Sequence, residues 1–382
     1  MKKKLIGASA LAAFAAGAYA QSSVTLYGVI DTAIVYTNNQ HGSAWQVNSS
    51  MLTNEVWGLN GSEDLGAGLH AIFRLENGFN LQNGGTPYPG TMFGRQAYVG
   101  LQDDKYGTLT LGRQFDAVVD YVDAIALVND GDGNNLAAHP FDNDNGSTTF
   151  LISNAVKYVS PTYKGLQAEG LYGFSNAAGG FASDRAYSLG VSYSNGPISL
   201  AAAYLQLNNG GLTATGSPTN TSGALSSNDS PPFPAASQRV MGAGGSYTFG
   251  PATVGLVWTH TLLDNTEPSV LVAQSYNRLR FDNYEISAHY TLTPTITLAG
   301  AYTFTEGAYG GATGSAQPKW HQMTLMADYS FSRRTDAYLE GVYQRTYGAQ
   351  SNSSFSQANI SGLASSSTGN QVAATMGIRT RF

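Results

Sequence analysis

The sequence contains no cysteine and few charged residues, and both absences limit what the protein can be. Without disulfide bonds, hydrogen bonding and packing must stabilise the fold even in an oxidising compartment. Charged residues make up 12% of the chain, against roughly 25% in typical soluble domains. The balance is acidic, with 19 Lys and Arg against 25 Asp and Glu. Because nucleic-acid binding needs a basic surface, we expect no nucleic-acid partner.

Long apolar runs are also missing after the N-terminus. No stretch of about 18 apolar residues occurs beyond residue 20, so we predict no transmembrane helix there. Glycine and aromatic residues are abundant instead, with 45 Gly, 23 Tyr and 16 Phe. A disordered chain would be poorer in aromatic residues. This composition is typical of a transmembrane β-barrel, which meets lipid on one face and water on the other.

The first twenty residues predict a secretory signal peptide. A basic start at residues 2–4 precedes a short, alanine-rich apolar stretch, and Ala18-Tyr19-Ala20 matches the pattern cleaved by signal peptidase. We therefore expect residues 1–20 to be removed and residues 21–382 to form the mature domain. Because three lysines leave with the signal peptide, the formal charge changes from −6 to −9.

Polar and apolar residues alternate over long segments. Within 283–292, one face carries Tyr284, Ile286, Ala288, Tyr290 and Leu292. The other face carries Asn283, Glu285, Ser287, His289 and Thr291. Segments 69–76 and 320–331 show the same period of two. Such alternation is required of a strand with one face in lipid and the other in water.

Turn residues divide the mature chain into strands whose connections are alternately short and long. Seven short turns, with both chain ends at the same rim, give sixteen strands. The predicted strands are 22–36, 51–63, 67–79, 91–102, 108–116, 148–160, 163–175, 182–194, 198–208, 238–249, 252–264, 279–292, 295–306, 319–331, 336–347 and 371–382. We therefore predict an all-β fold, a sixteen-stranded antiparallel transmembrane β-barrel.

The long connections differ in character. Residues 209–236 and 349–370 are rich in Ser, Asn, Gly and Thr, and we expect them to be exposed external loops. Residues 117–147 mix several aspartates with Val, Ile, Leu and Phe. A connection of this length is rarely structureless in a compact protein. We expect it to pack against the inside of the barrel wall.

Six segments along the mature chain share their motifs with one protein family. They are 21–31, 61–79, 95–101, 106–114, 154–158 and 376–382. Together they resemble the Gram-negative general-diffusion porins, and in particular the beta-proteobacterial branch of that family. The resemblance implies a homotrimer of sixteen-stranded barrels in the outer membrane, working as a water-filled diffusion pore and not as an enzyme.

The resemblance also implies a constriction, in which the third external loop folds into the barrel. The loop would be 117–147, and its acidic residues would face basic residues on the wall. Arg74 and Arg95 occupy the matching wall positions, and Glu76 shares the inward face of Arg74. The candidate constriction residues are Arg74, Glu76, Arg95, Asp116, Asp120, Asp123 and Lys157. Opposed charges of this kind would set up a transverse field for passing solutes.

Two departures from the family pattern affect the predicted ion preference. Val56 stands where the family often has an arginine, and Phe150, Leu151 and Ile152 stand where another is common. The constriction therefore has fewer basic residues than the family pattern. Together with the formal charge of −9, this predicts a weak preference for cations. Arg113, at a strand end, is an alternative candidate for holding the start of the loop.

Other functions are less well supported by the residues. A substrate-specific sugar channel would need an inward aromatic stripe, and Tyr27 and Trp320 are the main inward aromatics. An outer-membrane hydrolase would need a Ser–His or Asp–His set, which the pattern does not offer. The six histidines lack metal-ligand spacing, so we expect no metal and no cofactor.

We expect three kinds of partner. Two further copies of the chain would complete the homotrimer implied by the resemblance. Outer-membrane lipid and lipopolysaccharide would surround the barrel. The barrel-assembly machinery would recognise the alternating last strand, which ends on the aromatic Phe382.

Overall fold

The computed structural model describes residues 23–88, 90–129, 134–208, 223–225, 229, 231–311 and 314–382. The predicted signal peptide, residues 1–20, lies outside the described residues, as do parts of the predicted loops 117–147 and 209–236. No helix in the described part of the chain is long and apolar enough to cross a membrane.

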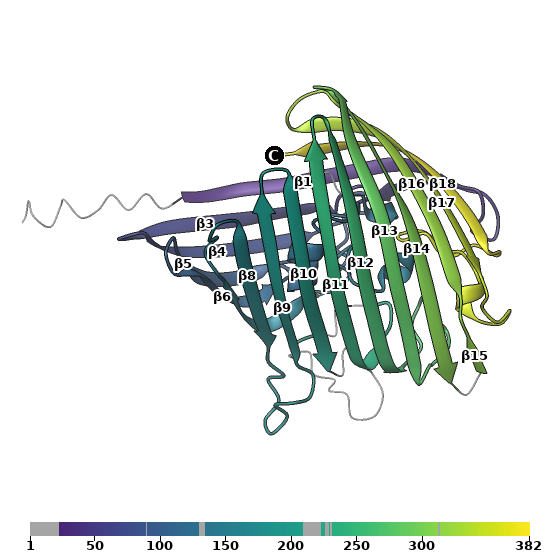
Figure 1. The fold of residues 1–382 in the computed structure, drawn as a ribbon, viewed down its shortest axis with the longest axis horizontal. Helices are drawn as coiled ribbons and strands as arrows, with labels where there is room; N and C mark the ends of the chain where they lie inside the picture. Colours follow the sequence, from purple (N-terminus) through teal and green to yellow (C-terminus); the bar gives the residue numbers. More distant parts are fainter. Residues whose placement is uncertain are drawn as a thin grey trace, which may run out of the picture.

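Eighteen strand segments of the described chain form one antiparallel sheet. They are β1 (Ser23–Thr37), β2 (Ala44–Ser49), β3 (Val56–Gly66), β4 (Leu69–Gly78), β5 (Ala97–Asp103), β6 (Gly107–Gln114), β7 (Ile152–Val159), β8 (Leu166–Gly173), β9 (Ala186–Asn195), β10 (Ile198–Asn208), β11 (Ala235–Phe249), β12 (Ala252–Thr266), β13 (Arg278–Thr293), β14 (Ile296–Gly311), β15 (Gly314–Ala316), β16 (Lys319–Ser330), β17 (Thr335–Tyr347) and β18 (Asn370–Arg381). The strands wind around a common axis (Figure 1).

The sheet closes on itself because β1 pairs with β18, from Val29 opposite Arg381 to Thr37 opposite Ala373. Two of the eighteen segments add no further wall. β2 and β3 pair with successive parts of β1, so together they form one barrel strand. β15 and β16 both pair with β14 in the same way. The described segments therefore make sixteen barrel strands, which confirms the predicted fold class.

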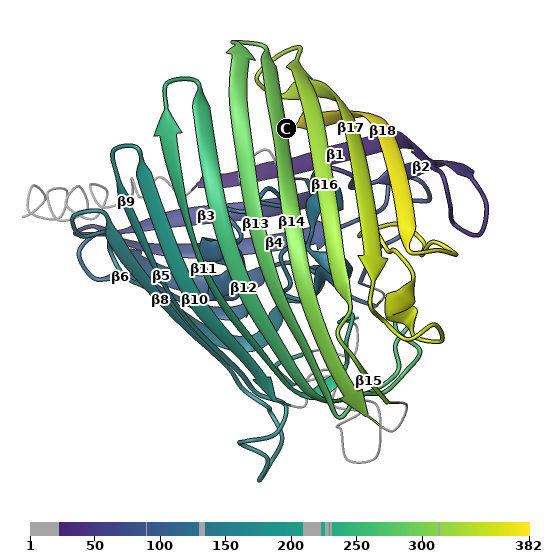
Figure 2. The ribbon, with the colours of Figure 1, turned by 45° about the vertical axis from the view of Figure 1, so that its right-hand side comes forward.

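The predicted alternation is confirmed along the wall. On β13, Tyr284 and Ile286 are 46% and 49% exposed, whereas Asn283 and Glu285 are buried. The outward side chains are those that lipid covers in a membrane, and the inward ones face the polar interior. The tall wall formed by β11 to β17 is seen in Figure 2.

One predicted strand boundary is wrong for a specific reason. The predicted strand 51–63 begins only at Val56, because residues 50–55 leave the sheet between β2 and β3. There the carboxylate of Asp31 accepts the backbone N–H groups of Leu52 at 2.6 Å and Thr53 at 2.7 Å. A side chain thus takes the place of a neighbouring strand as hydrogen-bond acceptor.

The connection between β6 and β7, of which the structure describes residues 115–129 and 134–151, folds into the barrel over these residues, and we call it the inward loop. It contains a π-helical turn, η2 (Val118–Val122), and two 3-10 turns, η3 (Asn135–Ala137) and η4 (Pro140–Asp142). The turn η2 packs against β9, β10 and β11. Val118 and Val122 of η2 join the buried wall residues Leu205 and Val240 in one hydrophobic cluster. The predicted packing of this loop on the inner wall is thereby confirmed.

An aromatic cluster joins the inward loop to three other external loops. Phe141 contributes from the inward loop, Phe233 precedes β11, Tyr276 precedes β13 and Phe355 precedes β18. The rings of Phe141 and Phe355 lie 5.4 Å apart in an edge-to-face arrangement. Trp320 of β16 is fully buried in the same cluster. Burial of these rings holds the loops over one side of the barrel mouth.

Candidate pore constriction

A polar cavity remains between the inward loop and the wall formed by β3 to β5. This constriction cavity has a volume of about 280 Å³. The wall contributes Arg74, Glu76 and Arg95, and the inward loop contributes Asp120. A second cavity of about 340 Å³ adjoins it, and Arg95 lines both. The structure thus brings together four of the seven candidate residues.

Arg95 connects the wall to the inward loop. Its Nε donates to Glu76 Oε1 at 2.9 Å, and its Nη1 donates to Thr148 Oγ1 at 3.0 Å. The guanidinium also lies over the ring of Phe115, 5.2 Å from the centroid. Glu76 accepts a further bond at 2.8 Å from the hydroxyl of Tyr27. The Arg95 and Glu76 charges therefore balance each other beside the cavity.

Among the basic residues that line the constriction cavity, Arg74 has the fewest interactions that offset its positive charge. Its guanidinium lies 5.3 Å from the centroid of the Tyr27 ring. Within the described part of the chain, no carboxylate lies within ion-pair distance of it. The positive charge of Arg74 is consequently available to solutes in the constriction cavity.

Lys157 and Asp120 contact each other directly and do not face across open space. The Lys157 Nζ contacts Asp120 Oδ2 and also lies 3.1 Å from Glu169 Oε1. Lys157 is buried, and it does not line the constriction cavity. Lys157 therefore lies between two carboxylates, one from the inward loop and one from β8.

Asp116 and Asp123 are buried and do not line the constriction cavity either. Asp116 Oδ1 accepts the backbone N–H of Val118 at 2.9 Å, and burial raises the pKa of its carboxyl to about 6. Burial, and then the charge of Asp144, raise the pKa of Asp123. Neither oxygen of Asp123 has a hydrogen-bond partner among the described residues. Both residues belong to the packing of the loop.

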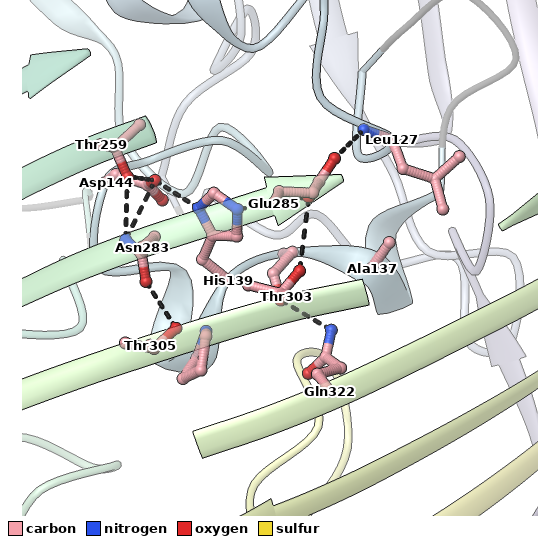
Figure 3. A network of polar contacts seen from close by, with 12 residues as sticks. Leu127, Ala137, His139, Asp144, Thr259, Asn283, Glu285, Thr303, Thr305 and Gln322 are labelled. Atoms are coloured by element: carbon pink, nitrogen blue, oxygen red, sulfur yellow. Dashed lines mark hydrogen bonds and ion pairs between the residues drawn. The ribbon is translucent and has the colours of Figure 1, made fainter. Parts of the chain in front are cut away.

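An ionic network around His139, which no sequence pattern predicted, fixes the loop to the wall (Figure 3). Its Nδ1 lies 2.5 Å from Asp144 Oδ2, and its Nε2 lies 3.3 Å from Glu285 Oε2. Burial alone would lower the pKa of His139, but the Asp144 and Glu285 carboxylates outweigh it and hold that pKa well above its usual value. Glu285 Oε1 also accepts the backbone N–H of Leu127 at 2.8 Å.

The two apolar departures from the family pattern lie beside the constriction cavity and in the wall. Val56 lines the constriction cavity, and Phe150 and Ile152 are buried in a hydrophobic cluster. Arg113 makes a two-point ion pair with Asp229, at 2.6 and 3.1 Å, and donates to Gly94 O at 2.7 Å. It therefore holds the β10–β11 connection, which the sequence analysis did not foresee.

A closed barrel with an apolar outer face and a polar cavity beside an inward loop defines the class of transmembrane β-barrel channels. The model of the Gram-negative porin family matches residues 7–349. The chain belongs to this family. It is an outer-membrane porin and not an enzyme.

Individual relatives agree with this assignment. An outer membrane porin protein of Bordetella pertussis is 36% identical over 287 residues, which cover 68% of this chain and 70% of the relative. Outer membrane porin protein 32 of Delftia acidovorans is 32% identical over 226 residues, covering 54% of this chain and 60% of the relative. The solved anion-selective porin from Comamonas acidovorans matches this chain with a TM-score of 0.73 at 22% sequence identity. The match covers 95% of this chain and 100% of the other. This similarity shows the fold.

Proposed function

We propose that the protein lets ions and small hydrophilic solutes diffuse passively between the inward loop and the β3–β5 wall, with a weak preference for cations. The observation that supports this best is the pair of adjoining polar cavities on that side of the barrel. The opposite side of the loop is packed against the wall by Val118, Val122 and the aromatic cluster. The path is therefore narrow and lies off the barrel axis.

The charges that line the two cavities support a weak preference. They are Arg74, Arg95, Glu55, Glu76 and Asp120. Three carboxylates stand against two guanidiniums among the lining residues, an excess of one negative charge that Lys157, behind the cavity, offsets in part through its contact with Asp120. One unit charge acting through water at about 8 Å changes the energy of each ion by ~0.5 kcal/mol, with opposite signs for K⁺ and Cl⁻, and screening at about 0.1 M salt roughly halves this, which corresponds to a permeability ratio of about 2. The proposed preference for K⁺ over Cl⁻ is therefore small.

Reversal potentials across planar bilayers in a KCl gradient test this proposal. We expect K⁺ to be favoured over Cl⁻ by a factor of about 2 at low salt, and less at high salt because of screening. A reversal potential of the opposite sign would refute the cation preference. Absence of any conductance would refute the diffusion path itself.

The sugar-channel alternative finds little support in the inward aromatic residues. Trp320 is fully buried, 6.0 Å from Phe141 and 5.8 Å from Phe355 between ring centroids, so it offers no open stacking face. The Tyr27 ring lies under the guanidinium of Arg74. Liposome swelling with sugars of graded size separates the two functions. Rates that decrease smoothly with solute size support general diffusion, whereas saturation by one sugar favours a specific channel.

We extend the proposal to a homotrimer. The solved OmpT structures of Vibrio cholerae include a trimer form, with a TM-score of 0.65 and 16% identity to this chain. Single-channel recording tests this arrangement directly. A trimer should close in three equal conductance steps, whereas a monomer should close in one.

A further inference from the structure

Several residues line both of the cavities between the inward loop and the wall. The cavity of about 340 Å³ also contacts Tyr88 of the β4–β5 connection and Ser361 of the β17–β18 connection, and we call it the outer cavity. The residues shared with the constriction cavity are Asn54, Arg95, Asn135, Ser147 and Thr148. Shared lining residues stand at the boundary of two cavities, so a solute that moves from one cavity to the other passes them.

The boundary residues are hydrogen-bonded to one another. Asn54 Nδ2 donates to Thr148 Oγ1 at 3.1 Å and to the carbonyl oxygen of Ser147 at 3.2 Å. Arg95 Nη1 donates to the same Thr148 Oγ1 at 3.0 Å, and Asn135 Nδ2 donates to Asn54 Oδ1 at 3.3 Å. We call these four linked side chains, Asn54, Arg95, Asn135 and Thr148, the polar partition. It joins the wall to the inward loop across the path.

Thr148 is fixed in an unusual backbone conformation. Its φ is +61°, in the left-handed region, which is unfavourable for a β-branched residue. Its N–H donates to the Asn145 carbonyl at 2.9 Å, and its own carbonyl accepts the Tyr88 hydroxyl at 3.2 Å. Such conformations persist only where the surroundings hold them, and they cluster at functional positions. Thr148 therefore presents its hydroxyl to the boundary with little freedom.

The backbone around Asn54 is also held on both sides. The segment that carries Asn54 leaves the sheet between β2 and β3, where two of its N–H groups donate to Asp31. From the inward loop, Asn135 Nδ2 donates to the Ser50 carbonyl at 2.8 Å, and the Asn135 N–H donates to the Leu52 carbonyl at 3.2 Å. The backbone is therefore anchored, and the Asn54 side chain is the part of the segment that can move.

Opening the partition requires only small changes. The bonds made by Asn54 join uncharged groups, and such bonds contribute little net free energy because water or a polar solute replaces them. The ion pair of Arg95 with Glu76 and that of His139 with Asp144 stay intact when the Asn54 side chain rotates away. Side-chain rotations of this kind are fast, so the partition can open at each passage of a solute.

We propose that the polar partition is the size filter of the pore. Solutes cross from the outer cavity to the constriction cavity by displacing Asn54 from Thr148 and replacing its hydrogen bonds. This inference rests on the diffusion path proposed above and names the residues that limit its width. Two properties are thereby separated, because charged residues such as Arg74 and Glu76 set the ion preference, whereas an uncharged contact sets the size limit.

The substitution Asn54→Ala tests the filter, because it removes the bridge without changing any charge. We expect the single-channel conductance of the purified full-length protein to increase about 1.5-fold or more, with an unchanged K⁺/Cl⁻ permeability ratio. In liposome swelling, the rate for a disaccharide relative to a pentose should increase about two- to threefold. The matched control is Asn60→Ala. Asn60 of β3 stands opposite Arg74 and lines neither cavity, so both measurements should stay as in the original protein.

Thr148→Val separates hydrogen bonding from bulk, because valine keeps the branched shape and lacks the hydroxyl. This variant should also increase the conductance. Its combination with Asn54→Ala should conduct like Asn54→Ala alone, since both substitutions break the same contact. Additive increases would show that the two residues act separately and would overturn the partition.

Thiol modification gives a second measurement that narrows the path instead of widening it. The sequence contains no cysteine, so Asn54→Cys and Asn60→Cys each introduce a single thiol. A bulky, uncharged methanethiosulfonate reagent should remove about two thirds or more of the current through Asn54→Cys and little of the current through Asn60→Cys. Equal losses in the two variants, or an Asn54→Ala conductance equal to that of the original protein, would overturn the size filter. Absence of conductance in the original protein would instead refute the diffusion path.

Discussion

At the scale of single residues, Glu76 sets the charge balance of the constriction cavity. It pairs with Arg95 and accepts from Tyr27, so its removal would take away the ion-pair partner of Arg95. Selectivity in such a pore follows the charge that lines the narrowest part. A single substitution at Glu76 should therefore change which ion passes more easily.

We predict that Glu76→Gln shifts the permeability from cations toward anions. The lining then carries two carboxylates against two guanidiniums, so the K⁺/Cl⁻ ratio should decrease from about 2 to about 1. Reversal potentials in a KCl gradient provide the measurement. The matched control is Glu306→Gln, which removes the same charge from the outer face and should leave the ratio unchanged. An unaltered ratio in Glu76→Gln would contradict the assignment of the cavity as the conducting path.

His139 gives the inward loop a defined pH dependence. Its pKa is raised in the folded protein, so its charge stabilises the loop fully below the ordinary histidine pKa, and that stabilisation is lost as the pH rises through the raised value. Asp144 behaves in the opposite sense: burial raises its pKa, but the His139 charge prevails and lowers it. Its contribution is lost only in strong acid. Asp123 and Glu285 complete the charged surroundings of the ring.

We therefore predict that alkaline pH loosens the inward loop. Channel recordings should show more frequent conductance fluctuations as the pH is raised above neutral, and acidification to about pH 5 should not produce them. His139→Gln should remove the pH dependence and lower stability by about 3–5 kcal/mol, because two buried carboxylates lose their cation. The control His41→Gln changes an exposed histidine and should retain the original behaviour. Identical pH profiles for both variants would argue against the role of His139.

At the scale of elements, the inward loop determines the width of the path. We predict that replacing residues 118–147 by a short Gly–Ser linker increases single-channel conductance by about two- to threefold, since the barrel interior is then open. Deleting residues 177–180, in the exposed connection between β8 and β9, is the control and should have no effect. Equal conductance after removal of the inward loop would show that it does not limit the flow.

The elements also show what sequence reasoning can and cannot reach. Strands β12, β13, β14, β16 and β17 were predictable because lipid and water impose a period of two on neighbouring residues, whereas the short β15 was not predicted. The break at residues 50–55 was not, because it depends on Asp31 reaching backbone groups about twenty residues away. Short sequence patterns do not predict contacts between residues that are far apart in the chain.

The same limit applies to the candidate site. Arg74, Glu76 and Arg95 belong to regular strands or their immediate ends, so alternation together with family resemblance was enough to place them near one another. Asp116 and Asp123 lie on the inward loop, whose path depends on distant partners such as Glu285. The side of the loop that each aspartate occupies could therefore not be inferred from the sequence.

At the scale of the whole molecule, the last residue sits at the closure of the barrel. Phe382 exchanges two backbone hydrogen bonds of 3.0 Å with Gly28. A Cβ at Gly28 would lie 2.3 Å from the Phe382 ring, so the ring packs where only glycine fits. The sequence analysis assigned Phe382 to recognition by the barrel-assembly machinery, and this assignment stays a prediction.

We predict that Phe382→Ala lowers the amount of protein inserted in the outer membrane of cells. The backbone bonds to Gly28 do not depend on the side chain, so the purified variant should still refold in detergent. Heat-modifiable migration on gels measures folding in both settings. An equal loss in cells and in detergent would assign the ring to packing and not to recognition.

The pairing of β1 with β18 joins residues more than 300 positions apart in the chain. This seam can form only when the entire polypeptide has been delivered, so the barrel cannot mature while it is being synthesised. Any truncated product keeps two unpaired strand edges, which invite aggregation. A simple criterion therefore separates mature from immature protein, namely whether β1 and β18 have paired.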